Sequence, residues 1–113
     1  NDPVVIANDI ADYLKIQKKC DLVIVLSHLG YKYKDNKISD IYIAENTKHI
    51  DLIIGGHTHT FMDEPDVRKN LSNEEVWIHQ VGWAGVKLGR INVKFLGKRK
   101  KMSSSTLTVI VDK

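Results

Sequence analysis

Three histidines carry most of the chemistry that this chain could perform. Gly55-Gly56-His57-Thr58-His59 comes directly after the apolar run 51–54, and His28 comes directly after another apolar run, 22–27. If both runs are parallel strands joined by a helix, the imidazoles lie at one edge of a sheet, where open α/β sheets place their ligands. Imidazole nitrogens bind zinc and several other transition metals. The spacing therefore predicts a metal site at this edge.

The prediction depends on the combination of features, because each one is weak evidence by itself. His57 and His59 are two residues apart and share a side of the chain if the backbone stays extended. The two glycines before them allow the backbone to turn and to approach a ligand closely. His28 alone would read as a hydrogen-bonded residue at the edge of the core. Its matched position after a strand makes it the third predicted metal ligand, with His57 and His59.

We interpret the other two histidines as structural. His49 lies near the end of a predicted short helix, where a positive charge interacts favourably with the helix dipole. His79 lies inside a predicted strand, between Ile78 and Gln80. A surface or core-edge position is a more common role for such a histidine than metal binding.

Length and composition indicate an ordinary globular domain or a part of one. The chain has 113 residues, of which 42% are hydrophobic and 27% charged. No apolar run is long enough to span a membrane, and the first residues resemble neither a signal peptide nor a start site. We therefore expect Asn1-Asp2-Pro3 to continue from a longer chain. Cys20 is the only cysteine and excludes an internal disulfide.

The net charge of +3 does not indicate nucleic-acid binding. Several basic residues cluster around Gly97, but no aromatic side chains are interleaved with them to stack on bases. We interpret the cluster as a turn between two strands whose charges protect a sheet edge. Its members are Lys94, Lys98, Arg99, Lys100 and Lys101.

The first half of the chain predicts alternating helices and parallel strands. A helix is expected over 3–18, because Asp2 is a good N-cap and Pro3 suits the first helical position. A strand at 22–27 is continuously apolar, as strands buried on both faces are. A short helix capped by Ser39 leads to a second strand at 51–55.

The second half predicts antiparallel strands. Residues 60–74 are charged and contain a proline, which favours an exposed loop. Three strands are then expected to form a β-meander, with turns at 82–85 and 97–102. Their ranges are 75–81, 86–95 and 105–111. The fold class is therefore α/β, with a parallel β-α-β unit followed by a mainly antiparallel meander.

Several motifs together resemble the calcineurin-like metallophosphoesterases, and most of all their 5′-nucleotidase and UDP-sugar hydrolase branch. The resemblance runs from residue 2 to about residue 95. The motifs that carry it are Ser27-His28-Leu29-Gly30, the segment 50–60 with its Gly-Gly-His-Thr-His sequence, Gln80-Val81-Gly82 with Gly85, and Leu88-Gly89-Arg90.

The resemblance implies a four-layered α/β/β/α fold with two divalent metal ions at the sheet edge. His28 and His57 would bind one ion, and His59 would bind the other. Such an enzyme hydrolyses phosphate monoesters, in this branch 5′-nucleotides. Zinc, manganese, iron, cobalt and nickel all accept histidine ligands, so the resemblance leaves the metal open.

The remaining metal and catalytic motifs of the family do not occur in the sequence. It contains no Asp-x-His and no Asn-His pair, and Asp21 and Asp51 precede their strands, at the opposite edge from the histidines. We therefore interpret residues 1–113 as the C-terminal half of a metallophosphoesterase domain, with no catalytic residue of its own. The missing N-terminal half would be its partner. The isolated chain would be inactive, with or without bound metal, and the parent protein would be periplasmic or extracellular.

Two other functions remain open from the residues alone. His28, His57 and His59 with one water could form a mononuclear metal site, because three histidines and a water are a known zinc arrangement. The chain could also be a non-enzymatic interaction domain. Half a sandwich leaves an apolar face and strand edges exposed, which favours pairing with a partner or self-association.

Overall fold

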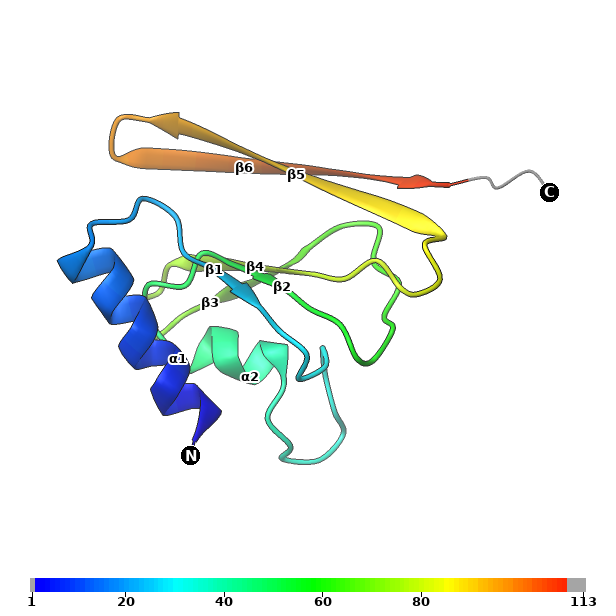
Figure 1. The fold of residues 1–113 in the computed structure, drawn as a ribbon, viewed down its shortest axis with the longest axis horizontal. Helices are drawn as coiled ribbons and strands as arrows, with labels where there is room; N and C mark the ends of the chain where they lie inside the picture. Colours follow the sequence, from blue (N-terminus) through cyan, green and yellow to red (C-terminus); the bar gives the residue numbers. More distant parts are fainter. Residues whose placement is uncertain (1, 110–113) are drawn as a thin grey trace.

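The structure, a computed structural model, describes residues 2–109 and has an α/β fold in layers (Figure 1). Two helices lie on one side of a four-stranded sheet, and a long hairpin lies on the other side. The elements in chain order are α1 (Pro3–Asp12), the π-helical turn η1 (Tyr13–Gln17), β1 (Ile24–Leu26), α2 (Asp40–Glu45), β2 (Leu52–Ile54), β3 (Asp66–Lys69), β4 (Glu75–His79), β5 (Lys87–Leu96) and β6 (Arg99–Thr108).

The four-stranded sheet has the order β1-β2-β4-β3. β1 pairs with β2, and β2 with β4, in parallel, with Leu52 opposite both Ile24 and Trp77. β3 is antiparallel to β4, and β5 is antiparallel to β6 in a separate two-stranded sheet. The predicted parallel β-α-β unit is therefore confirmed, and so is the antiparallel pairing of the last two predicted strands.

Both helices begin where their capping residues predict. The Asp2 carboxylate accepts a hydrogen bond from the Val4 amide at 2.9 Å, and Pro3 occupies the first helical position. The Ser39 hydroxyl accepts a hydrogen bond from the Tyr42 amide at 3.2 Å. Among residues 2–109, no helix combines the length and the apolar character that crossing a bilayer requires.

The hydrophobic core lies between the helices and the sheet. The first helix contributes Ala11, α2 contributes Ile43 and Ala44, and the sheet contributes Ile53 and Ile78, all of them buried. Burial of this apolar surface holds the parallel strands together, although β1 and β2 have only three residues each.

The predicted loop at 60–74 is wrong for its middle part, where Asp66–Lys69 form the edge strand β3. The strand alternates half-buried and exposed residues and pairs with β4 along its whole length. Its charged composition is typical of an edge strand, which is why it resembles a loop in the sequence. Tyr31 stabilises this edge, because its hydroxyl donates a 2.6 Å hydrogen bond to the Asp66 carboxylate.

The predicted three-stranded meander is also wrong in its pairing. The first of its strands, β4, pairs with β2 and β3 instead of β5. The predicted turn at 97–102 is shorter, because β6 begins at Arg99 and Gly97 takes the left-handed conformation with φ 63°. The last strand was expected to end at 111, and residues 110 and 111 lie outside the described residues.

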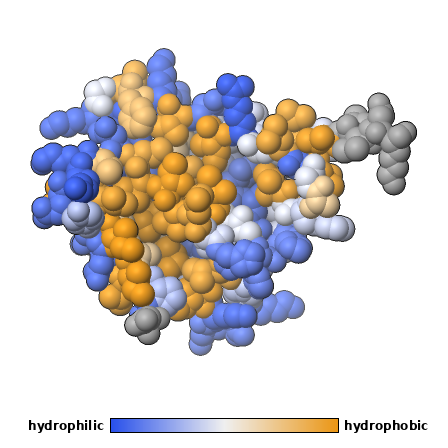
Figure 2. Space-filling view, viewed as in Figure 1, coloured by the Kyte–Doolittle hydropathy of each residue, from blue (hydrophilic) through white to orange (hydrophobic). Residues whose placement is uncertain are grey.

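The expectation that the strand at 22–27 is buried on both faces is wrong for one face. Val25 packs against the core, but Ile24 and Leu26 are 46% and 80% exposed. The hairpin approaches this face without sealing it and leaves a groove of about 350 Å³ lined by Ile24, Ile54 and Leu88, among others. Figure 2 shows a broad hydrophobic area on the side of the molecule where β1 is the edge strand.

Candidate metal site

The parallel strands bring two histidine-bearing loops together. At the end of β1, the Ser27 amide donates a hydrogen bond to the Ile54 carbonyl at 2.9 Å. At the end of β2, the Gly55 amide donates one to the His79 carbonyl at 2.9 Å. The loop that carries His28 therefore starts beside the loop 55–59, as the strand positions predict.

His28 and His57 are in direct contact at this edge. The distance from His28 Nε2 to His57 Nδ1 is 3.3 Å, and the ring centroids are 5.0 Å apart at an angle of 67°. Both side chains are exposed to solvent. Two ring nitrogens therefore converge at an accessible position, which is the arrangement that two ligands of one metal ion require.

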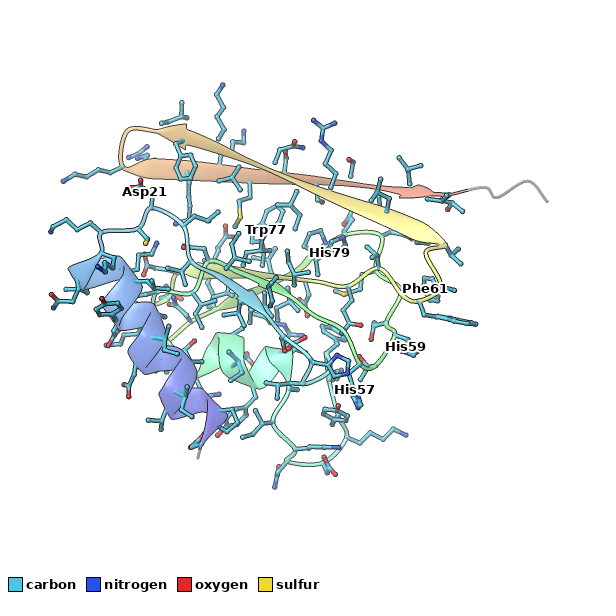
Figure 3. All side chains as sticks on the ribbon, in the orientation of Figure 1. Asp21, His57, His59, Phe61, Trp77 and His79 are labelled. Atoms are coloured by element: carbon cyan, nitrogen blue, oxygen red, sulfur yellow. The ribbon has the colours of Figure 1, made fainter. Side chains whose placement is uncertain are left out.

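His59 takes a different direction. His57 and His59 have φ values of 67° and 53°, so this backbone is not extended and the condition for their sharing one side is not met. The His59 ring stacks near Trp83, with centroids 6.4 Å apart and an angle of 22°. Figure 3 shows His57 and His59 on the same loop, far from Asp21. Within residues 2–109, no three His, Cys, Asp or Glu side chains converge closely enough to hold a metal ion.

The two glycines of this loop have different surroundings. A Cβ atom on Gly55 would clash with Asp40 Oδ2, whereas one on Gly56 would lie 3.6 Å from His28 Nδ1, an ordinary contact. Gly55 is therefore required because a carboxylate approaches the backbone there. The sequence predicted that a ligand approaches the backbone at these glycines. In the structure, the group that approaches Gly55 is the Asp40 carboxylate.

Asp40 is the residue at this edge that sequence reasoning missed. Its side chain is completely buried, and its Oδ1 accepts a 2.5 Å hydrogen bond from the Ser27 hydroxyl. Burial raises the pKa of the Asp40 carboxyl, although the Ser27 hydroxyl and the nearby Gln80 amide act in the opposite direction. In the sequence, Asp40 reads only as an acid that suits the first turn of a helix, and the paired glycines gave an indirect signal.

Gln80 fixes the rest of the loop from the end of β4. Its side-chain amide donates to the Gly56 carbonyl at 2.9 Å and to the Thr58 hydroxyl at 3.1 Å. Its side-chain oxygen accepts a hydrogen bond from the Thr60 amide at 2.9 Å. The Thr58 hydroxyl also accepts one from the Tyr31 amide at 3.1 Å. The histidine loop is therefore held by polar contacts from Gln80 on one side and from the Tyr31 backbone on the other.

The remaining histidines have structural surroundings. His49 Nε2 lies 3.3 Å from the Asp12 carboxylate. His79 is 4% exposed beneath β5, where a Cβ atom on Gly89 would lie 2.9 Å from its Nε2. Neither His79 ring nitrogen has a hydrogen-bond partner among the described residues, and burial lowers the pKa of its imidazole.

Known proteins with similar sequence and structure act on nucleotides. The chain is 35% identical over 95 residues to the trifunctional nucleotide phosphoesterase protein YfkN of Bacillus subtilis (strain 168), and 27% identical over 104 residues to the snake venom 5′-nucleotidase of Naja atra. These alignments cover 84% and 80% of this chain. The 5′-nucleotidase precursor of Thermus thermophilus has the same fold over 96% of the chain, with a TM-score of 0.76 and 27% identity. No protein-family model matches the chain.

Over most of its own length, the chain is similar to 5′-nucleotidases and related nucleotide phosphoesterases. It spans only part of these relatives: 6% of YfkN, 18% of the venom enzyme and 23% of the Thermus protein. The resemblance of the sequence motifs to 5′-nucleotidases is therefore confirmed, and so is the α/β fold class.

A metal ion fits the geometry of the two converging histidines. Two nitrogens bound at 2.0–2.1 Å to a tetrahedral zinc ion are about 3.3 Å apart. The observed distance between His28 Nε2 and His57 Nδ1 is the same, 3.3 Å. The two rings could thus ligate one ion with little movement, whereas the His59 ring lies against Trp83.

Asp51 lies at the opposite edge of the sheet, as its position before β2 predicts. One of its oxygens accepts hydrogen bonds from the Val23 amide and the Lys15 ammonium, each at 2.8 Å. Its other oxygen lies 2.6 Å from the Lys100 ammonium. All of these contacts connect elements of the fold, so Asp51 is structural and takes no part in the histidine site.

Proposed function

We propose that this chain supplies histidine ligands to a dinuclear-metal phosphoesterase that hydrolyses phosphate monoesters, specifically 5′-nucleotides. His28 and His57 bind one of the two divalent ions, and His59 binds the other. The observation that carries the proposal is the 3.3 Å approach of the His28 and His57 rings at the edge of the parallel strands. The nucleotide phosphoesterase relatives support the substrate class.

The division of labour follows from the residues present. A pair of divalent ions lowers the pKa of a bound water and neutralises charge on a phosphate ester. The chain's own contribution is to hold imidazoles at an exposed, polar edge where a phosphate can approach. The bridging carboxylate and the general acid come from a part of the parent protein that precedes this segment. A venom 5′-nucleotidase among the relatives supports export of the parent protein.

A metal titration tests the ligand assignment directly. Calorimetry with Mn²⁺ and Zn²⁺ is carried out on the chain, on His57→Ala and on His49→Ala. The second variant is a matched control, because His49 lies beside Asp12 and away from the site. We expect weak binding that His57→Ala removes and His49→Ala retains. Binding that does not depend on His57 would contradict the assignment.

The same titration distinguishes a site that other segments complete from a metal site that this chain forms alone. Tight one-to-one binding that is lost in both His57→Ala and His59→Ala would show a mononuclear site of three histidines. The stacking of His59 near Trp83 argues against that arrangement. Weak binding with no contribution from His59 fits a site that the rest of the parent protein completes.

The isolated chain is expected to show no hydrolysis of AMP or of p-nitrophenyl phosphate above background. Phosphate release is measured after extensive purification, with His57→Ala as the control for contaminating phosphatases. Turnover that survives purification and disappears in His57→Ala would show that the chain carries a complete active site. The proposal that other segments are required would then fail.

The open face of the sheet favours a second function, binding to a partner protein segment. Ile24, Leu26 and Ile54 are 46%, 80% and 43% exposed on neighbouring strands, a large apolar surface for so small a domain. Sedimentation velocity at increasing concentration should show self-association of the isolated chain, which Leu26→Lys reduces. A protein that stays monomeric at all concentrations would count against an interaction surface.

A further inference from the structure

We propose that Asp40 is a positioning residue that holds His28 and His57 at their ligating distance. The inference rests on the proposed metal site, and it goes further by assigning a role to a buried carboxylate outside the ligand set. Asp40 begins α2 on the helical side of the sheet, and its side chain reaches the ends of β1 and β2. It touches both of the loops that carry the converging histidines.

The first contact fixes the turn around His28. The Ser27 hydroxyl donates to Asp40 Oδ1 at 2.5 Å, and the same hydroxyl oxygen accepts a hydrogen bond from the Leu29 amide at 3.1 Å. Ser27 and Leu29 are the two neighbours of His28 in the chain. The carboxylate orients the hydroxyl, and the hydroxyl in turn closes the backbone on both sides of the histidine.

The second contact fixes the start of the loop that carries His57. Asp40 Oδ2 lies so close to Gly55 that a Cβ atom there would overlap it. The Asp40 amide also donates to the Gly30 carbonyl at 2.8 Å, which anchors the start of α2 to the chain just after His28. One residue on a rigid element therefore sets the spacing of both loops.

Stability alone is a poor explanation for a carboxylate at this place. Asp40 is fully buried, and its Oδ2 has no hydrogen-bond partner among the described residues. Burial raises the pKa of its carboxyl, so the charged form is disfavoured by the surrounding structure. Such unfavourable features persist where they serve a function, and here the function is the geometry of the adjacent histidines.

Cobalt binding tests the positioning role, because visible Co²⁺ absorbance reports the ligand geometry and the affinity together. The chain is compared with Asp40→Ala, Asp40→Asn and the matched control Asp51→Asn, which changes a buried carboxylate at the opposite edge. We expect Asp40→Ala to weaken Co²⁺ binding about tenfold, the usual effect of losing a residue that orients ligands. Asp40→Asn keeps the acceptor for Ser27 and should lose less. Asp51→Asn should lower the denaturant midpoint and leave the Co²⁺ affinity unchanged.

A second measurement works without metal and separates this inference from the proposed function. Hydrogen exchange of the Leu29 amide reports the Ser27 contact, and it should become about tenfold faster in Asp40→Ala and in Ser27→Ala. If the unmodified chain binds Co²⁺ no better than His57→Ala does, the metal assignment fails and amide exchange alone tests the positioning role. If Asp40→Ala does not fold, Asp40→Asn and Ser27→Ala take its place.

The outcomes that overturn the positioning role are specific. Unchanged Leu29 exchange together with unchanged Co²⁺ affinity in the Asp40 variants would do so. Equal loss of Co²⁺ affinity in Asp51→Asn would also do so, because it would show that both carboxylates act only through global stability. A selective loss in the Asp40 and Ser27 variants supports the proposal.

Discussion

Within residues 2–109, buried polar groups are paired at one end of the parallel strands and unpaired at the other end. At the edge where the parallel strands begin, both oxygens of Asp51 are paired, with the Val23 amide and with two lysine ammonium groups. At the edge where they end, Asp40 Oδ2 and both ring nitrogens of His79 have no partner among the described residues. At the first edge, contacts within the fold satisfy the hydrogen bonds of the buried carboxylate. At the second edge, these buried polar atoms lack such contacts among the described residues.

Left-handed backbone conformations occur at both edges, because Lys19, His49 and Asn73 also have positive φ values on the segments that lead into β1, β2 and β4. His57 and His59 both have positive φ values, which cost non-glycine residues about 1 kcal/mol or more each. The contrast between the edges therefore rests on the buried polar atoms that have no partner in the described part of the chain, Asp40 Oδ2 and the His79 ring nitrogens, which lie where the loops follow the parallel strands. The comparison teaches that the described fold pairs its buried carboxylate at one edge and leaves buried polar atoms unpaired at the other, which is the edge where we propose binding.

Removing the paired Asp51 carboxylate should have the largest effect on stability. Asp51→Ala removes the acceptor for the buried Val23 amide and leaves two lysines without their partner, so the unfolding free energy should fall by about 3 kcal/mol. Urea denaturation measures the change. Asp21→Ala is the control, because Asp21 is exposed in the neighbouring turn. Equal effects of the two variants would show that the Asp51 contacts contribute little.

Relieving the strain at the other edge should stabilise the fold by a smaller amount. His57→Gly removes the penalty of a side chain at φ 67°, so it should be about 1 kcal/mol more stable than His57→Ala. At His28, where φ is not positive, the order should reverse, with the glycine variant less stable than the alanine variant. Urea midpoints of the four variants check this. The same order at both positions would refute strain at His57.

The smallest effect should appear in the pH dependence of stability. Burial lowers the pKa of His79 in the folded chain below its value of about 6.5 in the unfolded chain. Its contribution is therefore complete above pH ~6.5 and is lost as the pH falls, because only the unfolded state takes up the proton. The loss should reach at most about 1 kcal/mol by pH ~5.5.

His79→Leu supplies the comparison for that prediction. The difference in unfolding free energy between the chain and this variant cancels the titration of the other groups. It should shift in favour of the leucine variant as the pH falls from about 7.5 to 5.5. A difference that stays constant over this range would mean that His79 takes up a proton without disrupting the fold.

The sequence predicted the main contact of the site because that contact follows from topology. His28 and His57 each follow an apolar strand, and parallel strands end at the same edge. Local capping rules likewise placed the starts of both helices at Asp2 and Ser39. Signals of this kind are carried by neighbouring residues and need no knowledge of tertiary packing.

The features that the sequence did not predict depend on partners far away in the chain. Asp40 reads only as an acid in the first turn of a helix, and its contacts with Ser27 and Gly55 depend on how α2 packs against the sheet. Residues 66–69 read as a loop until β4 provides a strand to pair with. The left-handed backbone at His59 was not predicted either, although histidine adopts that conformation more often than most non-glycine residues do.

The short turn at Gly97 has a consequence for the order in which the chain folds. β5 and β6 pair along their whole length across that turn, so the hairpin can form from local contacts within microseconds. Each parallel pairing instead joins segments separated by a helix or a long connection, and its loop must close first. The contact between His28 and His57 forms only after that closure. We therefore expect it to form after the hairpin, so that it reports the long-range closure that the hairpin does not need.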